Sequence, residues 1–390
     1  MSPLFAVKEG SDGMRGMYIH IPFCHQICHY CDFNKVFFKN QPVDEYIESM
    51  GQELAIMRQE GISFKEVETV FLGGGTPTSL SEKQLERLLE IIHEYVDVSS
   101  LKEFSTEANP DELTYGKLTV LKNGGVNRLS IGVQSFDADL LSKIGRTHSP
   151  DDAARVVGEA RRAGFDNISI DLIYGLPGQT IAQWQDTLDK ALALDLPHYS
   201  GYSLIVEPKT VFYNLMNKGK LPLPGEDIET EMFTMLIEQM ESKGRKRYEI
   251  SNFATPGHES IHNLIYWENA TYAGVGAGAH GYVNGTRYSN IGPIAKYMEK
   301  TAVGERPVQQ THIVTEIEAM EEEMFLGLRK SNGVSISLFQ EKFGKSLEDV
   351  YGETLQSLIK EGLVERLDDA VKLTHRGVYR GNDVFQQFLK

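Results

Sequence analysis

The chain has 390 residues, of which 41% are hydrophobic and 24% charged, a composition that excludes disorder as its main state and suffices for a sizeable core. Its formal net charge of −16 opposes binding to nucleic acid or to an anionic membrane surface. No apolar run reaches the roughly 18 residues of a membrane span, and residues 1–16 lack the apolar region of a signal peptide, so we expect a cytoplasmic protein without membrane insertion.

Short β-rich runs alternate with helical patterns from Met17 to about Val206. The expected strands are Tyr18–Ile21, Thr69–Leu72, Glu103–Thr106, Arg128–Val133, Asn167–Leu172 and Tyr199–Leu204. Alternation at this spacing predicts an α/β fold with a parallel sheet, either doubly wound or curled into a barrel. Periodicity alone does not choose between the two.

Helical spacing of apolar residues predicts one helix over Val43–Met57 and another over Leu85–Ile92. We expect Asp111 to cap a third helix, which ends at Gly124. Further along the chain, the pattern predicts a helix over 226–243 and a strand over 248–251.

Three cysteines are present, all in one stretch of eight residues, Cys24, Cys28 and Cys31. An odd, clustered set in a reducing compartment indicates metal or redox chemistry and not a disulfide framework. The spacing C-x3-C-x2-C suits three irons of a [4Fe–4S] cluster, whose fourth iron would stay open because no fourth cysteine exists. A zinc site of three cysteines with His25 or His29, or no metal at all, stays an alternative on spacing alone.

This motif, directly after the first strand of a (β/α) chain, resembles the signature of the radical S-adenosylmethionine (SAM) superfamily. The resemblance implies a partial (β/α)6 barrel in which the open iron binds the amino and carboxylate groups of SAM. It also implies that one electron from the reduced cluster splits a carbon–sulfur bond of SAM and leaves a 5′-deoxyadenosyl radical.

Further segments resemble the branch of this superfamily that contains coproporphyrinogen dehydrogenases. They include the strand-end loop of residues 71–78 and polar residues at the carboxyl ends of later strands, where barrel active sites lie. The SAM-binding residues that this resemblance implies are Tyr18, Tyr30, Gly74, Gly75, Thr76, Glu107, Gln134, Arg146 and Asp171.

Residues 276–281 satisfy G-x-G-x-x-G, a pattern of dinucleotide-binding folds. A turn-like sequence follows in place of a helix, so the required βαβ context is missing. We expect this segment to form a loop over the mouth of the barrel.

Two functions fit the resemblance. One is oxidative decarboxylation of coproporphyrinogen III; the other is heme delivery, as in chaperones of the HemW type. The dehydrogenase motif carries one further cysteine where this chain has Phe33, whereas His262-Asn-Leu-Ile-Tyr-Trp267 matches the H-N-x-x-Y-W motif of HemW-type proteins. The resemblance therefore implies a heme chaperone, with His262 as the heme ligand and the aromatic rings of Tyr266 and Trp267 against the porphyrin. A hydrogen-bonded core histidine is the alternative for His262, and His280 in the neighbouring glycine-rich segment is then the next candidate for the heme ligand.

The expected cofactors are a [4Fe–4S] cluster, SAM and heme, and the expected partners are heme and heme-accepting client proteins, including respiratory proteins of membranes. Whether the chain catalyses a reaction stays open. Four segments are expected: an N-terminal extension (1–16), a radical SAM core (17–245), a connecting segment over the barrel mouth (246–310) and a winged-helix-like α+β domain (311–390).

Overall fold

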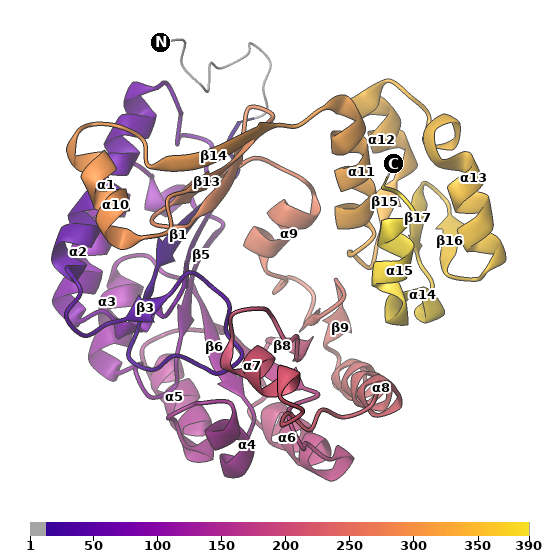
Figure 1. The fold of residues 1–390 in the computed structure, drawn as a ribbon, viewed down its shortest axis with the longest axis horizontal. Coiled ribbons are helices and arrows are strands. Elements are labelled where there is room, and N and C mark those ends of the chain that lie inside the picture. Colours follow the sequence, from indigo (N-terminus) through magenta and orange to yellow (C-terminus); the bar gives the residue numbers. More distant parts are fainter. Residues whose placement is uncertain (1–12, 390) are drawn as a thin grey trace.

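The computed structural model describes residues 13–389, and its centre is a curved sheet of 12 strands (Figure 1). Six neighbouring strands run parallel in chain order: β1 (Gly16–Ile21), β4 (Thr69–Gly74), β5 (Glu103–Ala108), β6 (Arg128–Gln134), β7 (Asn167–Tyr174) and β8 (His198–Ser203). The six predicted strands are confirmed, each to within about two residues at its start. A doubly wound sheet would reverse its strand order at a switch point, but this order never reverses. The fold is therefore a partial (β/α)6 barrel, as the resemblance implied.

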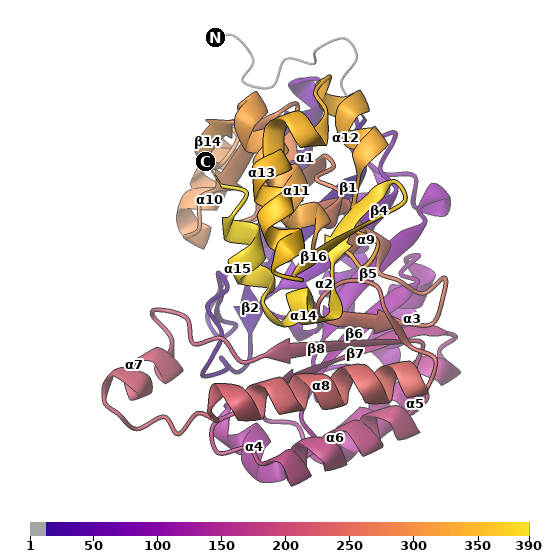
Figure 2. The ribbon, with the colours of Figure 1, turned by 90° about the vertical axis from the view of Figure 1, so that its right-hand side faces the viewer.

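Helices cover the outer face of this sheet, and the interior between the two layers is apolar (Figures 1 and 2). The helices that connect or follow the six strands are α1 (Val43–Gln59), α2 (Glu82–His93), α3 (Tyr115–Asn123), α4 (Ala138–Lys143), α5 (Pro150–Arg162), α6 (Ile181–Ala193), α7 (Val211–Asn217) and α8 (Glu226–Ser242). Short 3-10 turns lie at η1 (Pro77–Ser79) and η2 (Val98–Ser100). The predicted helices over 43–57, 85–92 and 226–243 are confirmed.

The start of α3 differs from the prediction. Thr114, not Asp111, caps this helix, because its side chain accepts a hydrogen bond from the backbone N–H of Lys117. Asp111 lies in a preceding turn, where the N–H groups of Glu112 and Leu113 both donate to the carbonyl of Asn109. Sequence signals for a cap and for a turn use the same residue types, so the pattern does not separate the two.

The sheet continues past both ends of the barrel. Beyond β8 lie β10 (Asn252–Ala254) and β9 (Lys246–Arg247), and beyond β1 lie β11 (Tyr272–Val275), β12 (His280–Val283), β13 (Thr286–Asn290) and β14 (Val308–Ile313). The predicted strand over 248–251 is wrong, because these residues form the bend between β9 and β10. The segment over 276–281 leads from β11 into β12.

Two of the expected segment limits lie within strands of this sheet. The limit between 310 and 311 falls inside β14. Of the expected N-terminal extension, residues 1–12 lie outside the described residues, and Gly16 already pairs with Tyr272 and Thr69 in the sheet.

The C-terminal domain follows β14 and lies beside the barrel (Figure 1). Its elements are α11 (Glu316–Gly327), β15 (Val334–Ser335), α12 (Ile336–Phe343), α13 (Leu347–Lys360), β16 (Val364–Leu367), β17 (Ala370–Leu373), α14 (His375–Tyr379) and α15 (Gly381–Gln386). A helix followed by a hairpin next to a third strand matches the expected winged-helix-like pattern. Within residues 13–389 no helix combines the length and apolarity needed to cross a membrane.

Two short strands and two helices complete the fold. β2 (Phe23–Cys24) and β3 (Val36–Phe37) pair in parallel and bracket the cysteine loop. α9 (Ile261–Trp267) lies between the barrel and the C-terminal domain, and α10 (Ile294–Ala302) packs on α1 (Figure 1).

Candidate functional site

The cysteine loop leaves β1 at the carboxyl end of the parallel strands. Cys24 is buried, whereas Cys28 and Cys31 are partly exposed. The hydroxyl of Thr76 donates to the sulfur of Cys24 at 3.6 Å. Burial, and then the neighbouring thiols of Cys31 and Cys28, raises the pKa of Cys24 to about 12. The three thiols therefore share one region of the barrel mouth.

The donor groups around this loop include two histidines besides the three thiols. Among residues 13–389, no three His, Cys, Asp or Glu side chains converge on one ion. A ring nitrogen of His25 lies 3.3 Å from the carbonyl of Ser79, and one of His29 lies 2.8 Å from that of Lys143. A tetrahedral zinc site needs four donors around one ion, whereas a cluster takes its thiolates on separate irons. Cys24, Cys28 and Cys31 on one loop fit the three thiolate positions of a cluster, while His25 and His29 each have a ring nitrogen at a backbone carbonyl.

Two glycines at the carboxyl end of β4 pack against β1 and the start of the cysteine loop. Gly74 has φ +114°, and a Cβ there would lie 2.5 Å from the ring of His20. A Cβ on Gly75 would lie 2.7 Å from the carbonyl carbon of Pro22. Both positions require glycine: Gly74 because of its positive φ and the His20 ring, and Gly75 because the backbone of Pro22 and Phe23 leaves no room for a Cβ.

Arg146 connects several predicted residues that are far apart in the chain. Its Nη2 donates to the hydroxyl of Tyr30 at 2.9 Å, and its Nη1 donates to Oδ1 of Asn109 at 2.6 Å. The amide of Asn109 in turn donates to Thr76 at 3.2 Å. Asn109 was not predicted from the sequence, although it stands at the carboxyl end of β5, two residues after Glu107.

Two carboxyl groups lie on nearby strands, Glu107 near the end of β5 and Asp171 within β7. Oε2 of Glu107 accepts a hydrogen bond from the backbone N–H of Gly74 at 3.0 Å. Burial, and then the carboxyl of Asp171, raises the pKa of Glu107 to about 8. Asp171 accepts from the hydroxyl of Ser130 at 3.2 Å, and burial raises its pKa as well. Such groups can accept hydrogen bonds from ligand hydroxyls such as those of a ribose.

Gln134 ends β6 in an unusual backbone conformation. Its φ is +63°, a region that costs a residue with a side chain about 1–3 kcal/mol. The β6–β7 register shifts between Gly132 and Gln134. The Gln134 amide and the Arg146 guanidinium both lie against Gly132, so the bulge turns Gln134 toward the arginine.

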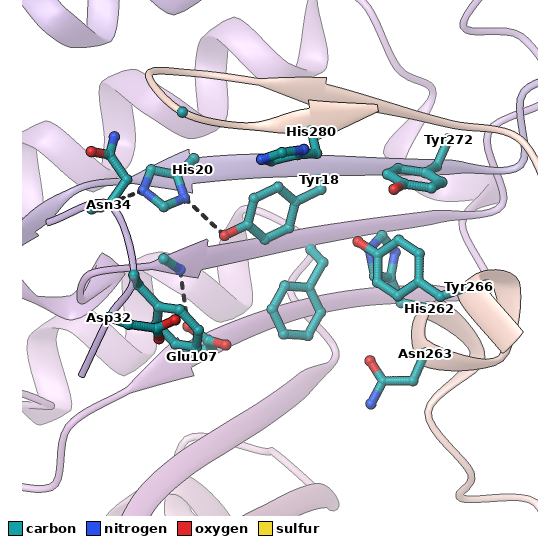
Figure 3. A pocket seen from close by; sticks show the side chains of 14 residues that line it. Tyr18, His20, Asp32, Asn34, Glu107, His262, Asn263, Tyr266, Tyr272 and His280 are labelled. Carbon is teal, nitrogen blue, oxygen red and sulfur yellow. Dashed lines mark hydrogen bonds between the residues drawn. The ribbon is translucent and has the colours of Figure 1, made fainter. Parts of the chain in front are cut away.

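A cavity of about 520 Å³ opens beside this network (Figure 3). It is lined by Tyr18, His20, Asp32, Phe33, Asn34, Phe71, Gly74, Glu107, His262, Asn263, Tyr266, Tyr272, Gly278 and His280. Tyr18, Gly74 and Glu107 were predicted to bind SAM, and His262 was predicted to bind heme. Residues predicted for two different ligands thus line the same cavity. The other predicted residues, Tyr30, Gly75, Thr76, Gln134, Arg146 and Asp171, lie outside its lining.

His262 is held by hydrogen bonds on both sides of its ring. Nδ1 lies 2.7 Å from the hydroxyl of Thr69, and Nε2 lies 2.8 Å from that of Tyr266. The ring stacks on Phe71, and only 1% of the residue is exposed. Burial, and then the charge of Arg128, lowers the pKa of His262 to about 3. In this conformation His262 is a neutral, fully bonded core histidine and has no free nitrogen for iron.

Trp267 also differs from its expected place against a porphyrin. It is absent from the cavity lining, and the guanidinium of Arg329 lies 4.6 Å from its ring. Successive helix residues are rotated by about 100°, so Trp267 leaves α9 on another side than Tyr266. Trp267 joins α9 to the C-terminal domain.

Several cavity residues were not singled out as site residues from the sequence. The hydroxyl of Tyr18 lies 2.9 Å from Nδ1 of His20, whose Nε2 lies 2.7 Å from the carbonyl of Asn34. His20 could have been found, because strand side chains two residues apart point to the same face. His280, named from the sequence only as the next candidate after His262, stood within the rejected glycine motif, and the structure places its ring in the cavity.

Comparison with known families agrees with this geometry. The profile of the radical SAM superfamily matches residues 18–191, and that of the HemN C-terminal domain matches residues 314–380. The barrel and cysteine loop thus belong to a radical SAM protein. A solved structure of coproporphyrinogen III oxidase (HemN) from Escherichia coli, 23% identical, superposes with a TM-score of 0.84 over 97% of this chain and 90% of that one. It supports the fold.

The sequence is also similar to proteins named heme chaperone HemW. That of Bacillus subtilis is 53% identical over 96% of this chain and 99% of its own length. That of Lactococcus lactis is 45% identical over 95% of this chain and 96% of its own length. The chain belongs to the HemW heme chaperone family of radical SAM proteins.

Proposed function

We propose that this protein is a heme chaperone, which binds heme and a SAM-ligated [4Fe–4S] cluster and delivers heme to client proteins. The observation that carries the proposal is the cavity at the barrel mouth, which opens beside the cysteine loop and is walled by aromatic side chains. A cytoplasmic location, as expected from the sequence, is part of the proposal.

The cluster would be held by Cys24, Cys28 and Cys31. SAM would contact Tyr18, Gly74 and Glu107 in the cavity, and Arg146 and Asp171 would set the charge beside it. When bound, a reduced cluster and SAM supply one-electron chemistry. Arg146 orients Tyr30 within the cysteine loop by a hydrogen bond of 2.9 Å. Glu107 holds a proton at neutral pH, because burial raises its pKa to about 8, and can therefore donate as well as accept a hydrogen bond.

Heme would occupy the outer part of the same cavity. A porphyrin needs an apolar wall, and Phe33, Tyr266 and Tyr272 provide aromatic surface there. Phe33 is 59% exposed, and it replaces the cysteine that dehydrogenases of this branch carry. The exposure of Phe33 suits a site from which heme must leave for another protein.

The experiment that tests the proposal compares delivery with decarboxylation. Cluster-loaded protein is incubated anaerobically with heme and an apo-hemoprotein, and in parallel with coproporphyrinogen III, SAM and a reductant. We expect the heme absorption to pass to the acceptor and no protoporphyrinogen to form. Formation of protoporphyrinogen would show that the protein is a coproporphyrinogen dehydrogenase, which is the alternative function from the sequence. Failure to bind heme would overturn the proposal of a heme chaperone.

A further inference from the structure

His280 carries an imidazole that is open to the cavity. It begins β12, is exposed, and lines the cavity together with Tyr18 and Phe33. Within residues 13–389 its ring makes no hydrogen bond, whereas both ring nitrogens of His20 and of His262 are occupied. Figure 3 shows His280 and Tyr18 among the side chains that line the cavity. Of the three histidines that line the cavity, His280 therefore has the nitrogens available for a ligand.

The backbone around His280 is fixed relative to the cysteine loop. The amide of Asn34, three residues after Cys31, donates to the carbonyl of Ala277 at 2.7 Å and to that of Gly292 at 3.1 Å. Gly278 has φ +77°, and a Cβ there would lie 2.6 Å from the Asn34 amide. The glycine-rich turn is thus docked on the cysteine loop, and this docking sets the position of His280.

The strand after the turn adds rigidity. His280 pairs with Ser289 across the β12–β13 hairpin. A Cβ on the next residue, Gly281, would lie 2.3 Å from the ring of Tyr288, so only glycine lets β12 pack this closely. An imidazole on a paired strand is better positioned for a metal than one on a free loop.

We propose that His280 is the protein ligand of the heme iron, and that His262 acts as a positioning residue through Tyr266. This inference rests on the proposed function and names the ligand within the same site. A neutral imidazole is a common axial ligand of heme iron, and the aromatic rings of Phe33 and Tyr272 flank the place where the macrocycle would lie. The glycine motif then serves to present an iron ligand, and not to bind a dinucleotide.

Heme binding by four proteins tests the proposal: wild type, His280→Ala, His262→Gln and the control His375→Ala, whose histidine is exposed in the C-terminal domain. Each is loaded with its cluster, so that the cysteines cannot bind heme iron, and titrated anaerobically with hemin. The readouts are the Soret difference spectrum, the electron paramagnetic resonance spectrum of ferric heme, and the affinity. Circular dichroism checks the fold.

Loss of a direct iron ligand should weaken hemin binding at least about tenfold, since loss of outer-shell partners alone costs about 10–100-fold. We expect this loss of affinity and an altered Soret band in His280→Ala. Added imidazole should restore hemin binding to this variant, measured as hemin that co-elutes with the protein. His375→Ala should bind hemin like the wild type. His262→Gln should keep the histidine-ligated ferric heme spectrum but bind hemin more weakly than the wild type, because Tyr266 loses the hydrogen bond that holds it in the cavity wall.

Unchanged hemin binding in His280→Ala would overturn the inference, as would loss of the histidine-ligated spectrum in His262→Gln alone. Both results leave the chaperone proposal standing, because the wild type still binds heme. Absence of hemin binding by the wild type would instead overturn the proposed function itself.

Discussion

The Nε2 atom of His262 lies 2.8 Å from the hydroxyl of Tyr266, one turn further along α9. On the other side of the ring, Nδ1 bonds to Thr69 on β4, so the histidine links α9 to the parallel sheet. The H-N-x-x-Y-W motif thereby places Tyr266 in the cavity wall. Its first histidine contributes by holding the wall in place.

The buried state of His262 predicts a pH-dependent difference in stability between the wild type and His262→Gln. The folded pKa is about 3, and the unfolded value is about 6.5. Between these values the unfolded chain takes up a proton that the folded chain does not, so the wild type loses stability as the pH falls below about 6.5. The variant lacks this loss but also lacks one or both hydrogen bonds, which costs about 1–3 kcal/mol at pH 8. Urea unfolding should show that the variant's deficit in free energy of unfolding is smaller at pH 5 than at pH 8. An equal deficit at both pH values would contradict a buried, neutral His262.

Glu107→Gln should stabilise the cofactor-free protein at alkaline pH. The carboxyl has a folded pKa of about 8 against about 4.3 when unfolded. The folded state holds the extra proton between these values, so the stability of the wild type falls as the pH rises from about 4.3 to about 8. The variant cannot titrate there. Its melting temperature relative to the wild type should therefore increase between pH 5 and pH 9, and equal differences at both pH values would exclude a raised pKa.

Cluster binding should depend on the cysteines and not on the neighbouring histidines. Anaerobically reconstituted wild type should hold about four irons per chain, and joint replacement of Cys24, Cys28 and Cys31 by Ala should remove them. The controls are His25→Ala and His29→Ala, because these rings already contact backbone carbonyls. Stoichiometric zinc in the wild type, lost in either control, would favour the three-cysteine zinc site instead.

We expect that substitutions in the predicted SAM site weaken SAM binding without loss of the cluster. Asp171 lies on β7 and Gln134 at the end of β6, and neither makes a direct hydrogen bond to the cysteines. Asp171→Ala and Gln134→Ala should weaken the change that SAM causes in the electron paramagnetic resonance spectrum of the reduced cluster, while iron content stays at the wild-type level. If iron is lost in both variants, the two residues have a structural role.

Trp267→Ala should affect stability more than heme binding. The ring contacts Arg329 of the C-terminal domain, and a cation–π contact of this kind contributes about 0.5–1 kcal/mol before lost packing is added. We expect a lower melting temperature, corresponding to about 1–3 kcal/mol in total, with unchanged hemin affinity. A large loss of hemin affinity in a folded variant would instead support the prediction that Trp267 packs against the porphyrin.

The parts of this protein that the sequence alone determined are those with a local signal. Short β-rich runs marked the six parallel strands, and helical spacing marked α1 and α2, because each signal lies within a few residues. The cysteine motif and the H-N-x-x-Y-W motif are short, continuous stretches, so they indicated the family by themselves, and relatives at 53% and 45% identity agree.

The tertiary structure decided which residues face the cavity and which are used elsewhere. Gly16 pairs with Tyr272, a residue far along the chain, and this pairing brings β11 and then His280 to the mouth of the barrel. Thr69 and Tyr266 hydrogen-bond to the two ring nitrogens of His262, and the guanidinium of Arg329 lies over the ring of Trp267. Burial and hydrogen bonding between distant segments leave no periodic trace in the sequence, because they depend on strand order and helix rotation, which only the folded chain brings together.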